Sequence, residues 1–132
     1  MAARAAVSGV LVGVGLDSVD VPRFARILAR RPAMAARLFT DHERSYADRL
    51  ADPTPSLAAR FAAKEATMKA LGVGLGAFGW DDVEVERMTG GAPTLVVRGR
   101  AAELAAKRGV GGWHVSMTHT DTTASAVVVA VS

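Results

Sequence analysis

The segment Phe61 to Gly72, FAAKEATMKALG, constrains the fold of this chain more than any other stretch. It closes a predicted helix from about Pro55 to Leu71, in which Thr54 suits the N-cap and Gly72 suits the residue just past the end. At about 100° per residue, this helix has a bulky apolar face and a flat face of small residues. Their members are Leu57, Phe61, Met68 and Leu71 on the first, and Ala59, Ala62, Ala63, Ala66 and Ala70 on the second. We therefore expect the helix to be buried on both faces.

Charged residues interrupt this apolar helix. Glu65 and Lys69 lie between the two faces at i,i+4 spacing, while Lys64 lies within the bulky face and Arg60 at its edge. On an arbitrary helix, such a pair is usually solvated and worth only a few tenths of a kcal/mol. Here the buried flanks, and the carboxylate of Asp17 described next, favour a functional role instead.

Asp17 follows a segment with the period of a β-strand. In Val7 to Leu16, VSGVLVGVGL, one face carries branched apolar residues and the other carries Leu11, Gly13 and Gly15. Glycines on a strand face indicate close approach of another backbone or of a ligand. Asp17 belongs to the glycine face, where we expect the strand to give way to a helix beginning near Asp20, which reads as an N-cap.

Two carboxylates brought together raise each other's pKa unless a cation lies between them. Mg²⁺ fits that role, because it prefers hard oxygens and is usually held by one or two carboxylates together with substrate phosphates. The pairing of Asp17 with Glu65 therefore suggests phosphate chemistry.

Three motifs in order resemble one family. The segments are GLDSVDVPR (Gly15 to Arg23), RFAAKEATMKALG (Arg60 to Gly72) and WHVSMTHT (Trp113 to Thr120). They are similar to the signatures of holo-acyl-carrier-protein synthase, the short class of phosphopantetheinyl transferase. The resemblance covers nearly the whole chain and implies a homotrimer with sites between neighbouring subunits. The pattern of helices and strands along the chain predicts an α+β fold, with an antiparallel sheet packed by a long central helix.

The resemblance also implies an activity, which is transfer of the phosphopantetheine arm of coenzyme A to a serine of an apo acyl carrier protein. Asp17 and Glu65 would be the Mg²⁺ ligands, and Lys69 would act with them as a catalytic residue that approaches the phosphates. The residues implied for coenzyme A binding are Arg60, Phe61, Lys64, Lys69, Pro93, His114 and Ser116. Arg23 would dock the acidic helix of the carrier. The serine hydroxyl must lose its proton, and either Glu65 or a metal-bound water could accept it.

Three positions depart from or refine the family pattern. Asp20 stands where members often have glutamate, although its capping role survives the change. Ala92 replaces a basic residue that often precedes the equivalent of Pro93, so a phosphate contact could be lost or supplied by Arg98 or Arg100. Val19 stands where the longer class has a third metal carboxylate, which favours the short class.

The remaining chain predicts a single domain over residues 1–132. We expect helices at Val21 to Ala29, Ala33 to Leu38, Asp41 to Leu50 and Gly99 to Lys107, and strands at Val83 to Met88, Thr94 to Val97, Trp113 to Thr118 and Thr123 to Val131. A glycine-rich turn from Gly72 to Gly79 follows the central helix.

Composition narrows the environment and the partners. The chain has no cysteine, which excludes disulfides and thiolate catalysis and makes a cytoplasmic protein the default. Its apolar start is too short to span a membrane and reads as a strand instead of a signal peptide. A net charge of +3 does not call for nucleic acid, but Arg23, Arg26 and Arg30 share one helix side and indicate an acidic protein partner.

Two other function classes use the same residues. A magnesium-dependent phosphohydrolase would use Asp17 and Glu65 with water as the nucleophile, and would cleave coenzyme A or a related nucleotide without a carrier. A non-catalytic carrier-binding protein would keep the arginine face but tolerate loss of Glu65. A serine hydrolase built from Ser116, His114 and Asp121 is disfavoured, because Ser116 lies in mid-strand with no nucleophile elbow.

Overall fold

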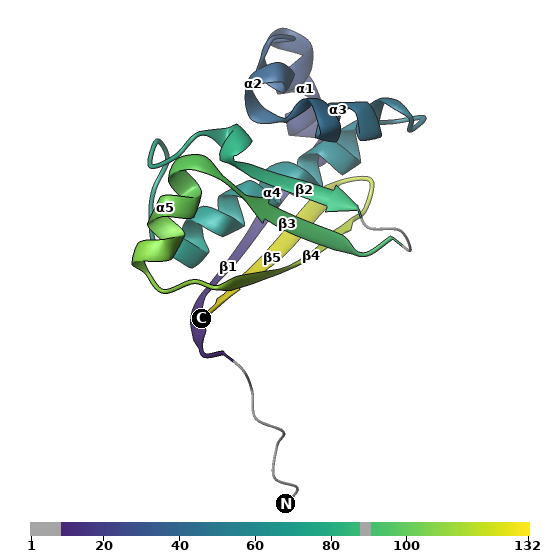
Figure 1. Cartoon of the computed structure of the whole chain (residues 1–132). Helices are drawn as coiled ribbons and strands as arrows, with labels where there is room; N and C mark the ends of the chain where they lie inside the picture. Colours follow the sequence, from purple (N-terminus) through teal and green to yellow (C-terminus); the bar gives the residue numbers. More distant parts are fainter. Residues whose placement is uncertain (1–8, 88–90) are drawn as a thin grey trace, which may run out of the picture.

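The computed structural model describes residues 9–87 and 91–132, which form the α+β fold drawn in Figure 1. In chain order the elements are β1 (Leu11–Asp20), α1 (Val21–Arg30), α2 (Met34–Leu38), α3 (Asp41–Asp48), α4 (Thr54–Leu71), the short 3-10 helix η1 (Trp80–Asp82), β2 (Val83–Arg87), β3 (Pro93–Val97), α5 (Gly99–Lys107), β4 (Gly112–His119) and β5 (Thr123–Val131).

The strands form two antiparallel sheets, where the sequence suggested one. The larger sheet has the order β1-β5-β4, and β2 pairs with β3 in a separate hairpin. Asp17 on β1 lies opposite Ala126 on β5, which in turn lies opposite Met117 on β4. The expected arrangement of antiparallel strands packed by a long helix is confirmed.

Helix α4 is the centre of the fold. It packs along β1 and β5 of the larger sheet on one side and contacts β2 and α3 on another, so both of its apolar faces are buried as expected. Gly72 ends the helix with φ of 68°, the left-handed conformation that favours glycine. The expected N-cap is wrong: Pro53 takes that position, and Thr54 lies inside the first turn with its N–H bound by Asp52 Oδ1 at 3.1 Å.

The glycines of β1 allow this strand to lie directly on α4. A Cβ atom on Gly15 would come within 1.8 Å of Ala66 O, and one on Gly13 within 1.9 Å of Ala70 O. No side chain fits at either position. The predicted close approach of another backbone is thus confirmed, and the flat alanine face of α4 is the surface that receives it.

Strand β1 begins at Leu11, which leaves Gly9 and Val10 of the predicted strand outside it, and it continues beyond the predicted boundary to Asp20, so Asp17 lies within the strand and not at its end. Asp20 caps α1 as expected, accepting a hydrogen bond from Arg23 N at 2.9 Å. Helix α3 ends at Asp48, two residues earlier than predicted. The other described elements agree with the predicted ones to within one or two residues, while residues 7, 8 and 88–90 of the predicted strands and turn lie outside the described part.

Helices α1, α2 and α3 gather at one end of the molecule, over the N-terminal half of α4 (Figure 1). Beneath them lies a second core that includes Phe24, Phe39 and Leu57. In the described residues, no helix is long and apolar enough to cross a bilayer.

Candidate active site

Asp17, Glu65 and Lys69 meet where β1 crosses the C-terminal half of α4. Lys69 Nζ lies 2.9 Å from Asp17 Oδ1 and also donates to Leu16 O at 3.0 Å. The side chain of Glu65 is half-buried and lies within hydrogen-bonding reach of the Asp17 carboxyl group. The structure therefore brings together the three residues that the sequence singled out, because Gly13 and Gly15 let β1 lie on α4 at the required depth.

The pKa of Glu65 is raised to about 8. The largest cause is desolvation by burial, followed by the hydrogen bond to Asp17 and the Asp17 charge, while the Lys69 ammonium opposes the shift. A carboxyl group with such a pKa needs additional positive charge to ionise at neutral pH.

This donor set fits a hard divalent cation. Asp17 on β1 and Glu65 on α4 supply carboxylate oxygens, and the Lys69 ammonium already forms an ion pair with Asp17. Within the described residues, no group of three or more His, Cys, Asp or Glu side chains gathers at one place. A pair of carboxylates suits Mg²⁺, which keeps waters and takes further oxygens from a substrate phosphate.

A cleft of about 330 Å³ opens beside Glu65, one member of the carboxylate pair. Glu65 lies in its wall, with Phe61 on the same helix and Ser18, Val19, Asp20, Arg23, Phe24 and Ile27 around it. Phe61 is held by aromatic neighbours on both sides, with ring centroids 5.3 Å from Phe24 and 5.1 Å from Trp80. The expected site residues Phe61 and Arg23 are thus next to Glu65.

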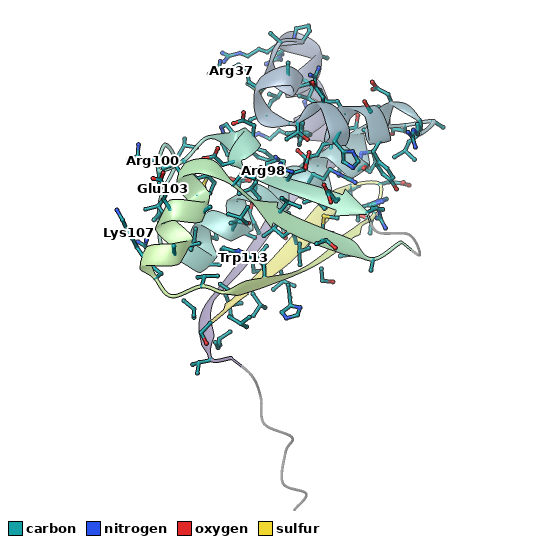
Figure 2. The ribbon with its side chains drawn as sticks, in the orientation of Figure 1. Arg37, Arg98, Arg100, Glu103, Lys107 and Trp113 are labelled. Atoms are coloured by element: carbon teal, nitrogen blue, oxygen red, sulfur yellow. The ribbon has the colours of Figure 1, made fainter. Side chains whose placement is uncertain are left out.

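An apolar groove of about 430 Å³ adjoins this cleft and shares Phe24, Ile27 and Phe61 with it. Met34, Leu38, Leu75 and Trp80 complete its lining, with Arg31 and Arg37 on the rim. Figure 2 shows Arg37 projecting from the helical end of the molecule. No Asp or Glu occurs between Val21 and Thr40, so the groove is apolar inside and positively charged outside. Arg26 is exposed on α1, as is Arg23.

Arg60 lines a separate, smaller pocket of about 170 Å³. Its guanidinium group is buried over the ring of Tyr46, 4.6 Å from the centroid, and donates to Ser56 Oγ at 2.5 Å. Burial lowers the pKa of Arg60, and among the described residues no acceptor reaches its Nε atom. The remaining lining includes Arg87 and His119. A pocket with two guanidinium groups and a free buried donor is suited to an anion.

Pro93 lies close to this pocket, because it pairs with Arg87 across the β2–β3 hairpin. Arg98, considered as a substitute for the basic residue absent at Ala92, is engaged elsewhere. Its Nη2 atom binds Glu84 Oε1 at 3.1 Å. Arg100 is exposed on α5 (Figure 2).

Lys64 does not reach the cleft. Its ammonium is fully buried against the equally buried carboxylate of Glu43, at 2.8 Å, and donates to the backbone oxygens of Trp80 and Val83. The Glu43 carboxylate also accepts from Val85 N at 3.0 Å. Lys64 therefore joins α4 to α3, η1 and β2, and in this arrangement no phosphate can contact it.

His114 and Ser116 are also not brought to the carboxylate pair. Both are exposed on β4 and pair with Val129 and Val127 of β5. Strand alternation puts them on the outer sheet face, whereas Val115 and Met117 pack toward α4. Within one chain they lie across the sheet from Glu65.

The pocket lined by Arg60 and Arg87 is called the arginine pocket below. The sequence did not point to its members Arg87, Tyr46 and His119, or to Glu43 beside Lys64. His119 could have been found by alternation, because it shares the inward parity of Val115 and Met117. Glu43 had a signal in the capping box Thr40–Glu43, which the structure contains. Arg87 and Tyr46 carried no signal, since their neighbours come from distant elements.

The chain matches the model of the 4'-phosphopantetheinyl transferase superfamily over residues 13–128. A holo-[acyl-carrier-protein] synthase of Frankia casuarinae is 52% identical over 120 residues, which cover 91% of this chain and 97% of that protein. The crystal structure of holo-[acyl-carrier-protein] synthase from Neisseria meningitidis has a TM-score of 0.83 at 30% identity and covers 92% of this chain and 98% of that one. A holo-(acyl-carrier-protein) synthase from Bacillus anthracis, in complex with CoA (3',5'-ADP), has a TM-score of 0.77 at 32% identity, with coverage of 92% and 97%.

The chain therefore belongs to the 4'-phosphopantetheinyl transferase superfamily. Within that superfamily its similarity is to the holo-acyl-carrier-protein synthases, and the resemblance noted in the sequence is confirmed.

Proposed function

We propose that this protein transfers the 4'-phosphopantetheine group of coenzyme A to a serine hydroxyl of an apo acyl carrier protein and releases adenosine 3',5'-bisphosphate. The observation that carries the proposal is the convergence of Asp17, Glu65 and Lys69, with Glu65 in the wall of a cleft that continues into an apolar groove with a positively charged rim. The carboxylates and the ammonium suit a diphosphate, and the groove suits a protein substrate.

Asp17 and Glu65 would hold Mg²⁺, which, when bound, neutralises negative charge on the coenzyme A diphosphate. Lys69 would donate to an oxygen of the same diphosphate, since its side chain is more than half exposed and its ammonium lies 2.9 Å from Asp17 Oδ1. These charges matter most as the transition state develops, because the departing phosphate gains negative charge.

The transfer forms a bond between the serine oxygen and the phosphorus that carries pantetheine. It breaks the bond from that phosphorus to the bridging oxygen of the diphosphate, which leaves with adenosine 3',5'-bisphosphate. The serine proton must move to a base. In the described lining of the cleft the carboxyl groups are those of Glu65 and Asp20, and Asp20 is engaged in capping α1. Among the side chains that line the cleft, we therefore assign Glu65 as the proton acceptor.

The arginine pocket would bind the second anionic part of coenzyme A, its 3'-phosphate. The diphosphate is assigned to Lys69 and the carboxylates, so the monoester needs a separate cationic site. Arg60 offers a buried donor that no acceptor in residues 9–87 or 91–132 reaches, and Arg87 and His119 line the same pocket. Charge-assisted hydrogen bonds to a phosphate would satisfy these donors.

The apolar groove and its arginines would dock the carrier. An amphipathic acidic helix could place apolar residues on Phe24, Ile27 and Met34 while its carboxylates face Arg23, Arg31 and Arg37. This groove is the feature that distinguishes a transferase acting on a protein from a phosphohydrolase acting on a nucleotide.

We also propose that the chain assembles as a homotrimer through the outer face of its larger sheet. Val14 is 51% exposed and Leu16 is 62% exposed, and the two lie opposite Val129 and Val127. Contiguous exposed apolar surface of this kind commonly marks a subunit interface. His114 and Ser116 lie on the same face, so the assembly would place them between subunits. Sedimentation of the wild type as a monomer would contradict this arrangement.

The direct test incubates the protein with coenzyme A, Mg²⁺ and an apo acyl carrier protein, followed by intact-mass measurement of the carrier. A gain of the phosphopantetheine mass, lost in Glu65→Gln and when the carrier serine is replaced by alanine, is expected. Release of adenosine 3',5'-bisphosphate at the same rate without any carrier would instead identify a phosphohydrolase.

A further inference from the structure

Lys69 has two protein acceptors at the site, and one of them is a proposed metal ligand. Its ammonium donates to Asp17 Oδ1 at 2.9 Å and to Leu16 O at 3.0 Å. The Asp17 side chain is only 16% exposed, whereas the Lys69 side chain is 56% exposed. The ammonium therefore approaches a sheltered carboxylate from the solvent side.

This position conflicts with a divalent ion on the same oxygen. A dication bound by Asp17 and Glu65 would lie a few ångströms from the ammonium, and the two positive charges would repel each other strongly at that separation. The Lys69 ammonium occupies Asp17 Oδ1, so a dication on Asp17 must either displace the ammonium or bear its repulsion from the other carboxylate oxygen, and the pairing with Lys69 therefore weakens metal binding. The long, exposed stem of Lys69 allows its ammonium to swing away without movement of α4.

We propose that Lys69 is an internal counter-ion that holds a divalent cation off Asp17 until a diphosphate draws the ammonium away. The inference rests on the proposed function, because it takes Asp17 and Glu65 as the metal ligands. It gives Lys69 two successive partners, the Asp17 carboxylate in the free protein and the diphosphate of coenzyme A in the complex.

The exchange has a thermodynamic consequence. A diphosphate that binds Lys69 releases Asp17 for the cation, so each of the two ligands strengthens the binding of the other by the same factor. The free protein binds the cation weakly, and the cation and coenzyme A are taken up together.

The experiment measures Mn²⁺ binding by electron paramagnetic resonance of the free ion, with and without coenzyme A. Lys69→Met keeps the length of the side chain and removes its charge, and Lys69→Arg restores the charge. Lys107→Met is the matched control, because Lys107 is also in the last turn of a helix and is exposed on α5, where it projects outward (Figure 2). Asp17→Asn measures the Mn²⁺ that coenzyme A binds by itself. Thermal melts establish that each variant is folded.

Without coenzyme A, we expect Lys69→Met to bind Mn²⁺ roughly tenfold more tightly than the wild type, with Lys69→Arg and Lys107→Met unchanged. Coenzyme A should tighten Mn²⁺ binding more in the wild type than in Lys69→Met. Equal affinity of the wild type and Lys69→Met without coenzyme A, with Asp17-dependent binding when it is present, would overturn this inference and leave the metal assignment intact. Binding that is the same in Asp17→Asn and the wild type with coenzyme A would overturn the metal assignment itself.

Discussion

Gly15 lies so close to Ala66 that a Cβ atom on the glycine would come within 1.8 Å of the alanine carbonyl oxygen. The obstacle is backbone, which cannot move aside as the end of a side chain can. This contact sets the distance between β1 and α4, and Asp17 follows Gly15 by two residues on the same strand face. The packing of a glycine on a helix thus determines whether the two carboxylates meet.

Gly15→Ala should therefore reduce both stability and activity. Overpacking against a backbone atom costs about 3 kcal/mol in a well-packed core, and any relief requires β1 to move away from α4. We expect a matching loss in the free energy of unfolding, measured by urea denaturation. Gly74→Ala is the control, because a Cβ atom at Gly74 meets nothing within 4 Å. Equal stability of the two variants would contradict the role given to this contact.

The close packing and the carboxylate pair could be predicted from sequence because they depend on local periodicity. Alternation in β1 places Gly13, Gly15 and Asp17 on one face, and the helical period places Glu65 and Lys69 between two apolar faces. Only one further assumption, that the two elements pack together, was needed to bring Asp17 and Glu65 into contact.

The predicted site residues that lie away from the carboxylate pair depend on partners that periodicity does not reveal. Lys64 was assigned to coenzyme A, yet Glu43 and two backbone carbonyls from η1 and β2 surround it, and those partners come from separate parts of the chain. His114 matches the family motif but faces outward, and the histidine of the same strand that lines the arginine pocket is His119. Which face of a strand is covered depends on tertiary packing.

The stability of the metal-free protein should fall as pH rises, because of Glu65. Its pKa is 4.5 when unperturbed and about 8 in the folded protein, so the folded state holds a proton that the unfolded state loses across this window. The stabilisation from this proton is present below the unfolded pKa and is lost as pH rises through the folded pKa. Urea denaturation between pH 5 and pH 8.5 should show the decline, and Glu65→Gln should flatten it. If the free energy of unfolding of Glu65→Gln fell with pH as steeply as that of the wild type, the decline would belong to another titratable group.

Removal of the buried Lys64 charge should destabilise the protein strongly. Lys64→Met leaves the Glu43 carboxylate buried without a counter-ion, which costs about 3–5 kcal/mol in comparable buried pairs. Adding Glu43→Gln removes the unpaired charge and should recover part of the loss. A double-mutant cycle from chemical denaturation measures the coupling. Normal stability of Lys64→Met, together with weaker coenzyme A binding, would restore Lys64 as a ligand-binding residue.

The arginine pocket predicts that the 3'-phosphate of coenzyme A is recognised separately from its diphosphate. Arg87 is the variant of choice, because it is exposed while Arg60 is buried. Arg87→Ala should raise the KM for coenzyme A roughly tenfold, the effect of one charge-assisted hydrogen bond. The KM for 3'-dephospho-coenzyme A should not change. An equal rise for both substrates would place the 3'-phosphate outside this pocket.

The arginines of α1 should act on the carrier and not on coenzyme A. Arg23 and Arg26 are both exposed, and Arg23 lines the cleft beside Glu65. Their joint replacement by alanine should raise the KM for the carrier roughly fivefold to tenfold at low salt, with little change in the KM for coenzyme A. The difference from the wild type should shrink as salt rises, because ions screen the attraction between exposed charges.

Arg108→Ala, which removes an exposed charge next to α5, is the matched control and should leave both constants unchanged. Equal increases in the two KM values for the Arg23 and Arg26 variant would show that these residues support the site as a whole and do not dock the carrier.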